Sequence, residues 1–329
     1  MKHFNFLDKI YDDIEKMIDN GELEEGLNAL VNSAQVHNGN MLIDMDRHSK
    51  IYGKYLFYKG DRTRSMFLLR DYVQRRPDDE DAVLLYIENC LDLDKPDDAF
   101  NYLVRLMDKK NPSKKVTFFY LLYLISSNNF ENAINLFKDL HRRKVLDVME
   151  YIKISYYFLM KRRFDLCKDV LLCGLSVHKG NTKLQEEFEY ARQVEMFYIE
   201  NIKNYYFPYI DKFQYRQELY AKGLRYMVEI LSVRFYYEDE IELAADLLVE
   251  INKINFFVKY KTLAAICDYF LIRDIFEDWE ADTVMIKFYG VKLETVKNRL
   301  NKIKKYGFMQ EFDEKLEMIR ENMGEYDYE

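Results

Sequence analysis

The stretch GDRTRSMFLLRDYV, residues 60–73, joins a turn residue to a helical pattern that returns along the chain. Its small residue, Ser65, comes five positions after Gly60 and four before the apolar Leu69, so Ser65 and Leu69 share a helix face. The same pair returns every 34 positions, with small residues Ser65, Ala99, Ala133 and Cys167 followed by Leu69, Leu103, Phe137 and Leu171. This period predicts a helical repeat and favours a binding scaffold over an enzyme.

Each repeat is expected to consist of two helices joined by a turn. The turn positions, five residues before each small residue, are Gly60, Asp94, Asn128 and Arg162, of which three are turn formers. The first helix has its own apolar face, made by Tyr52, Tyr86, Tyr120 and Ile154 and, four positions later, by Leu56, Cys90, Leu124 and Phe158. A degenerate earlier copy has Gly21, Gly26 and Leu30. The pattern predicts five repeats over residues 7–181.

These spacings resemble the tetratricopeptide repeat (TPR) over a little more than half of the chain. Gly53 stands where paired helices of that family pack closely, and Pro77 stands at a repeat end. The family's Trp position departs from the pattern, with Ile10, Ser49, Val83, Thr117 and Tyr151 in its place. The resemblance implies an all-α protein, a TPR-like α-solenoid followed by a C-terminal helical domain.

Composition narrows the class of protein. With 49% hydrophobic and 16% aromatic residues, the chain is too apolar to be disordered. The four cysteines form no C-x-x-C pair and are expected to be reduced core thiols of a cytoplasmic protein. The sequence shows neither a signal-peptide apolar region nor a bilayer-spanning stretch, so no membrane association is expected. The net charge of -8 argues against non-specific nucleic-acid binding by the whole molecule.

A second pattern, TVMIKFYGVKLETVKNRLNKI, occupies residues 283–303. One helix is expected to end at Gly290, with Val291 filling the turn, and an apolar stripe holds the next helix down through Leu293, Val296, Leu300 and Ile303. The segment resembles a DNA-binding helix-turn-helix, and with residues 261–281, interpreted as another buried helix, it resembles the end of a cyclin-like repeat of general transcription factor B. The resemblance implies that the opposite face meets the major groove of duplex DNA through Lys292, Glu294, Lys297, Asn298, Asn301 and Lys305.

Two positions depart from the helix-turn-helix pattern. Ile286 stands where the family usually has Ala, and Lys292 stands where a capping Ser usually begins the second helix. A lysine-rich helix face near a C-terminus is also typical of solvated surface, so a protein-binding or purely structural role stays open.

The TPR resemblance also implies a partner, a protein or peptide bound on the concave face made by the first helices. In the second repeat Arg47, Lys50 and Lys54 share one helix face and suit an acidic peptide. The family's carboxylate clamp is not reproduced, because the first repeat offers Asp8, Tyr11 and Glu15. Farther along, an apolar floor for an amphipathic helix or for the chain's own C-terminal domain is expected from Phe118, Leu122, Ile152 and Tyr156. The alternative is a solvated basic face with ordinary packing between repeats.

The remaining segments complete the domain prediction. Residues 182–257 are expected to be helices that cap the last repeat, with a stop at Pro208, followed by the helix-turn-helix region at 258–310 and an acidic tail at 311–329. No catalytic constellation, metal spacing or phosphate loop is present, so neither an enzyme nor a cofactor is expected. The sequence favours a regulator that binds a protein partner and DNA; the alternative is a pure protein scaffold. It indicates no oligomeric state.

Overall fold

The computed structural model describes residues 2–36, 44–234 and 237–326, and all regular secondary structure in this part of the chain is helical. The predicted all-α class is therefore confirmed. The chain divides into two compact units, residues 1–133 and 134–329. The division falls within α8 (Phe130–Arg142), inside the region predicted as repeats.

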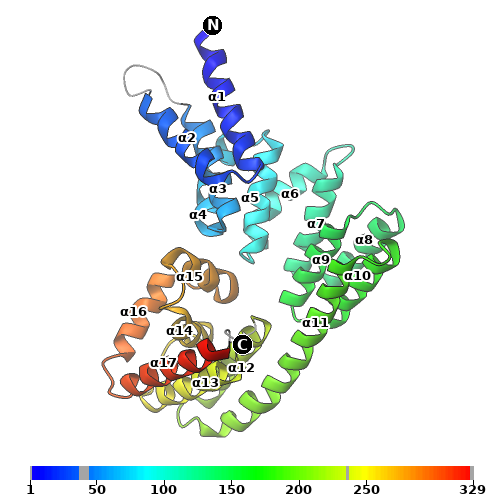
Figure 1. Ribbon diagram of the computed structural model, residues 1–329. Coiled ribbons are helices and arrows are strands. Elements are labelled where there is room, and N and C mark those ends of the chain that lie inside the picture. Colours follow the sequence, from blue (N-terminus) through cyan, green and yellow to red (C-terminus); the bar gives the residue numbers. More distant parts are fainter. Residues whose placement is uncertain (1, 37–43, 235–236, 327–329) are drawn as a thin grey trace. The chain divides into compact units, whose positions relative to one another are not determined.

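The first unit is a series of helices that follow one another along the chain (Figure 1). Its helices are α1 (Lys2–Asp19), α2 (Leu23–Val36), α3 (Met45–Lys59), α4 (Arg62–Arg75), α5 (Glu80–Asp92), α6 (Pro96–Met107) and α7 (Lys114–Ser126). Each helix packs against the next, and the first helices of the pairs also pack in a row, α1 against α3, α3 against α5, and α5 against α7. This packing is consistent with a helical repeat.

The repeat is clearest at the turns that join the two helices of each pair. A residue with positive φ lies at each one: Gly21 (87°), Gly60 (95°), Asp94 (53°), Asn128 (61°) and Arg162 (58°). The predicted turn positions are thus confirmed, including Arg162, which is not a typical turn former. The left-handed conformation at these positions ends one helix and turns the chain into the next.

The recurring small residues are packing positions, as predicted. Ser65, Ala99, Ala133 and Cys167 are all buried, and so are their apolar partners. At Gly53 an added Cβ would lie 2.9 Å from Leu69 Cγ, so α3 and α4 approach more closely than any other residue would permit. Ser65 Oγ donates to Gly53 O at 2.7 Å and accepts from Asn89 Nδ2 at 3.0 Å, which links α4 to both α3 and α5.

The second unit continues from α8 through a further pair of helices into a helical bundle. Its elements are α9 (Val148–Met160), α10 (Phe164–Val177), α11 (Thr182–Asn201), the π-helix η1 (Ile202–Tyr206), the 3₁₀-helix η2 (Phe207–Lys212), α12 (Gln217–Val233), α13 (Glu238–Lys253), α14 (Tyr260–Ile272), α15 (Asp278–Val284), the π-helix η3 (Met285–Tyr289), α16 (Leu293–Ile303) and α17 (Met309–Tyr326). The α-helical geometry of α11 ends before Pro208, which lies in η2.

One hydrophobic core unites the bundle, and α14 lies at its centre. Residues 263–272 of α14 are all buried, and the helix packs against α12, α13 and α16. The core extends from Tyr209 to Leu316, and therefore includes parts of the predicted segments 182–257 and 258–310 and of the predicted acidic tail, which forms α17. The predicted division of this region stays a prediction.

A buried polar network ties three elements of the bundle together. Asp268 on α14 is fully buried, pairs with Arg234 at the end of α12, and accepts the hydroxyl of Tyr289 on η3 at 2.8 Å. The interpretation of residues 261–281 as one helix is wrong, because α14 ends at Ile272 and a capping box between Glu277 and Glu280 begins α15.

Three of the cysteines, Cys90, Cys167 and Cys267, are buried; Cys173 is half-buried, and all four are free thiols. Within the described ranges, no helix combines the length and the apolar character needed to cross a bilayer.

Candidate functional site

The candidate site in the second unit is the helix–glycine–helix segment, residues 278–303, hereafter the Gly290 segment. Its first helix, α15, continues as η3 and ends at Gly290, which has φ 65° and ψ 29°. A Cβ at Gly290 would meet no atom within 4 Å, so the backbone conformation, not space, requires glycine there. The predicted turn is confirmed.

The second helix of the segment, α16, lacks a side-chain cap of its own at Lys292. A carboxylate from the preceding helix takes over this role, because the backbone N–H of Leu293 donates to Asp282 Oδ1 at 3.0 Å. One free N–H at the start of α16 is therefore satisfied across the turn, and the two helices are joined at this point. Asp282 was not identified from the sequence, although the missing cap at Lys292 was a signal that another acceptor was needed.

One face of α16 is buried and the other is open. Leu293, Val296, Leu300 and Ile303 are buried in the bundle core, as the stripe predicted. The exposed side chains from Lys292 to Lys305 are Lys292, Glu294, Thr295, Asn298, Asn301, Lys302, Lys304 and Lys305. This face carries one acid against four lysines, together with two amides that can both donate and accept hydrogen bonds.

Lys297 differs from the other predicted DNA-contact residues. Its ammonium lies 2.6 Å from Asp278 Oδ1, and its side chain is 34% exposed. The hydrogen bond that Lys297 donates to Asp278 raises the pKa of Lys297, which stays protonated. Because Asp278 is 79% exposed, the pair is solvent-screened and contributes little to stability.

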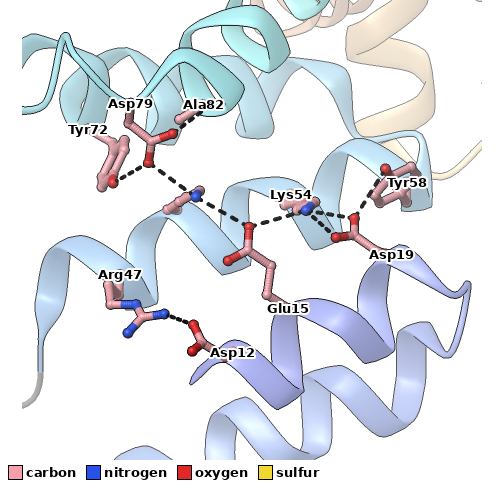
Figure 2. A network of polar contacts seen from close by, with 10 residues as sticks. Asp12, Glu15, Asp19, Arg47, Lys54, Tyr58, Tyr72, Asp79 and Ala82 are labelled. Carbon is pink, nitrogen blue, oxygen red and sulfur yellow. Dashed lines mark hydrogen bonds and ion pairs between the residues drawn. The ribbon is translucent and has the colours of Figure 1, made fainter. Parts of the chain in front are cut away.

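The second candidate site is the polar face of the first unit, shown in Figure 2. The three cations predicted there lie on α3, and each is already paired with carboxylates of neighbouring helices. Arg47 pairs with Asp12. Lys50 lies 3.3 Å from Glu15 and 3.1 Å from Asp79, and Lys54 lies 3.2 Å from Glu15 and 2.6 Å from Asp19.

These carboxylates change what the polar face can bind. Asp12, Glu15 and Asp19 come from α1 and Asp79 from the start of α5, so four acids surround three cations. Burial would lower the pKa of Lys54, but the hydrogen bonds and charges of Asp19 and Glu15 outweigh burial and raise that pKa. An acidic peptide would have to displace carboxylates that belong to the same unit. Asp8, the other acid noted at this face, lies outside the side chains that the structure describes.

The four apolar residues predicted as a partner floor fall in different units. Phe118 and Leu122 on α7 are buried in the first unit. Ile152 on α9 is half-buried, and Tyr156, also on α9, is 40% exposed in the second unit. Met149, one turn before Ile152, is 56% exposed, so α9 presents an apolar strip of Met149, Ile152 and Tyr156 to solvent.

Lys287 on η3 contacts the α9 strip. Its ammonium donates to Tyr156 Oη at 3.0 Å and lies 5.2 Å from the centre of the Tyr156 ring. The two residues are 131 positions apart, and no local signal in the sequence connects them.

Among the residues that the structure describes, no group of three or more His, Cys, Asp or Glu side chains is arranged to hold a metal ion. Comparison of the chain with protein-family models, with curated proteins and with solved structures found no match.

Proposed function

We propose that this protein is a non-enzymatic helical-repeat regulator that binds duplex DNA through the open face of α16. The observation that carries the proposal is the two-sided character of that helix: four apolar residues hold it on the bundle, while amides and lysines cover the side that faces solvent. A helix held in this way after a glycine turn resembles the second helix of a helix-turn-helix, which lies in the major groove.

The side chains on the open face divide into two roles. Asn298 and Asn301 are three positions apart and exposed, and an Asn side chain can pair with the donor and acceptor of adenine in the major groove. Lys302, Lys304 and Lys305 are also exposed at the end of α16, where point charges suit phosphates. The net charge of -8 argues against non-specific DNA binding by the whole molecule, which favours contact through a local basic face.

The experiment is the selection of random duplex DNA fragments by the full chain at about 0.15 M salt, followed by measurement of Kd over a range of salt concentrations. We expect an enriched sequence. We further expect Lys305→Glu to weaken binding to all sequences and to reduce the slope of log Kd against log salt by about 1. Asn298→Ala and Asn301→Ala should relax the sequence preference instead.

The matched control is Lys222→Glu on α12, which makes the same change of charge at a lysine whose side chain is 62% exposed. It should leave Kd nearly unchanged. Equal weakening by Lys222→Glu and Lys305→Glu would show a general charge effect and no defined interface. Failure to retain any DNA at about 0.15 M salt would remove the DNA-binding proposal.

The second candidate function is that of a protein scaffold, and the α9 strip favours it. Met149 and Tyr156 expose apolar surface on one side of a helix, the kind of surface that an amphipathic partner helix covers. A partner isolated with the full chain should then be lost on Met149→Asp, whereas binding to DNA should persist. The two functions are compatible, because the strip and the open face of α16 lie on different helices.

A further inference from the structure

The contact between Lys287 and Tyr156 joins the two candidate surfaces of the second unit. Tyr156 belongs to the α9 strip, and Lys287 lies on η3, three residues before the turn of the Gly290 segment. The ammonium donates a hydrogen bond to the Tyr156 hydroxyl at 3.0 Å and lies 5.2 Å from the centre of the same ring.

Buried groups hold the backbone beside Lys287, and a half-buried ion pair holds the end of α9. Beside Lys287, the backbone carbonyl of Phe288 accepts the hydroxyl of Tyr226 at 2.5 Å, and Tyr289 donates to the buried Asp268. On the other side, Arg162 at the end of α9 lies 3.4 Å from Glu229 on α12. These interactions fix the backbone beside Lys287 and the end of α9, so both side chains project from ordered helices.

Lys287 also occupies a position where a phosphate contact is expected. In the docking geometry of a helix-turn-helix, the first helix crosses the DNA backbone while the second enters the groove. An ammonium that is bound to Tyr156 must give up that contact before it can neutralise a phosphate. While Lys287 stays on Tyr156, that phosphate contact is not made, and the affinity for DNA is lower by its contribution.

We propose that the Lys287–Tyr156 contact is an intramolecular restraint on DNA binding, and that covering or removing Tyr156 releases Lys287 for a phosphate. This inference rests on the proposed DNA-binding function and adds its regulation.

The test is a double-mutant cycle on the full chain, with Kd for duplex DNA measured against salt concentration. Tyr156→Ala should tighten binding about fivefold, the equivalent of about 1 kcal/mol at 25 °C. It should also raise the slope of log Kd against log salt by about 0.9, because one more phosphate is neutralised. In a Lys287→Gln background, Tyr156→Ala should change neither quantity.

Two further variants test whether the effect requires the Tyr156 hydroxyl and whether it is specific to Tyr156. Tyr156→Phe keeps the ring but loses the hydroxyl, so it should give a smaller gain than Tyr156→Ala. Met149→Ala removes a more exposed apolar side chain from the same strip, one that does not contact Lys287, and should leave Kd for DNA unchanged. Circular dichroism of each variant checks that the helices are intact.

The outcomes separate the restraint from the DNA-binding proposal. In one outcome the unmodified chain binds DNA, and Tyr156→Ala either leaves Kd unchanged or changes it equally with and without Lys287. This outcome overturns the restraint and leaves the DNA-binding proposal standing. Binding seen only after Tyr156→Ala, and lost again with Lys287→Gln, supports the restraint in its strongest form. Absence of binding in every variant overturns both.

Discussion

At Asp79 one carboxylate connects three helices of the first unit. Its Oδ1 accepts the backbone N–H of Ala82 at 3.1 Å, while its Oδ2 accepts the Tyr72 hydroxyl at 2.8 Å and lies 3.1 Å from the Lys50 ammonium. Burial would raise the pKa of Asp79, but these donors outweigh burial and lower it. The carboxylate therefore stabilises the folded state above its unfolded pKa of about 3.9, and this stability is lost as the pH falls through the lower folded pKa.

We predict that Asp79→Asn lowers the free energy of unfolding by about 1–2 kcal/mol at pH 7, because the amide can still cap α5 but loses the charge that Lys50 and Tyr72 recognise. The difference between the two proteins should shrink below about pH 4, where the carboxylate becomes protonated. Urea unfolding followed by circular dichroism at pH 7, 5 and 3 measures it. The control Asp81→Asn changes an exposed acid of the same helix and should cost a few tenths of a kcal/mol. A difference that does not vary with pH would contradict the assignment.

At the scale of the helix, α16 depends on an acceptor outside itself. We predict that Asp282→Ala lowers the free energy of unfolding by about 1 kcal/mol, because the N–H of Leu293 loses its partner at 3.0 Å. Asp282→Asn supplies an amide oxygen at the same place and should recover most of the loss. Unfolding followed by the fluorescence of Trp279 on α15 reports the effect. If Ala and Asn behaved alike, the carboxylate would not be capping α16.

The pair α3 and α4 depends on the close approach at Gly53. We predict that Gly53→Ala lowers the free energy of unfolding by about 1–3 kcal/mol, since its Cβ would lie 2.9 Å from Cγ of the fully buried Leu69. Gly307→Ala is the control, because no atom lies within 4 Å of the added Cβ. Comparable losses from both substitutions in thermal unfolding would show that the close approach to Leu69 does not decide the result.

Local periodicity explains why these elements could be predicted. The turn at Arg162 was placed by the 34-residue period although arginine does not favour it, and its φ of 58° confirms the position. The break between α14 and α15 was missed because no Pro or Gly marks residues 273–277, and a capping box between two glutamates starts α15 instead. The stripe of α16 was correct because four apolar residues at helical spacing admit one buried face.

Contacts between helices that are far apart in the sequence could not be predicted from the sequence. The sequence placed Glu15 at the same face as Lys50 and Lys54 but did not predict that it pairs with both lysines, because their meeting depends on how α1 is rotated against α3. Lys287 and Tyr156 are separated by 131 positions and meet only because α9 and η3 fold into one unit. Periodicity identifies which face of a helix is buried, whereas the partners of its polar side chains depend on tertiary packing.

At the scale of the whole molecule, the two units have separate buried clusters, one around Tyr11, Ile51 and Leu56 and the other around α14. We predict that they respond separately to substitution. Trp279, the single tryptophan, reports on the second unit, while circular dichroism reports on both.

Tyr289→Phe removes a hydroxyl from the buried Asp268 and should lower the Trp279 midpoint by the equivalent of about 1–2 kcal/mol. Gly53→Ala should shift only the circular dichroism transition of the first unit and leave the Trp279 midpoint unchanged. If Gly53→Ala moved the Trp279 midpoint equally, the two units would unfold as one cooperative body, and substitutions in one could not be assigned to it alone.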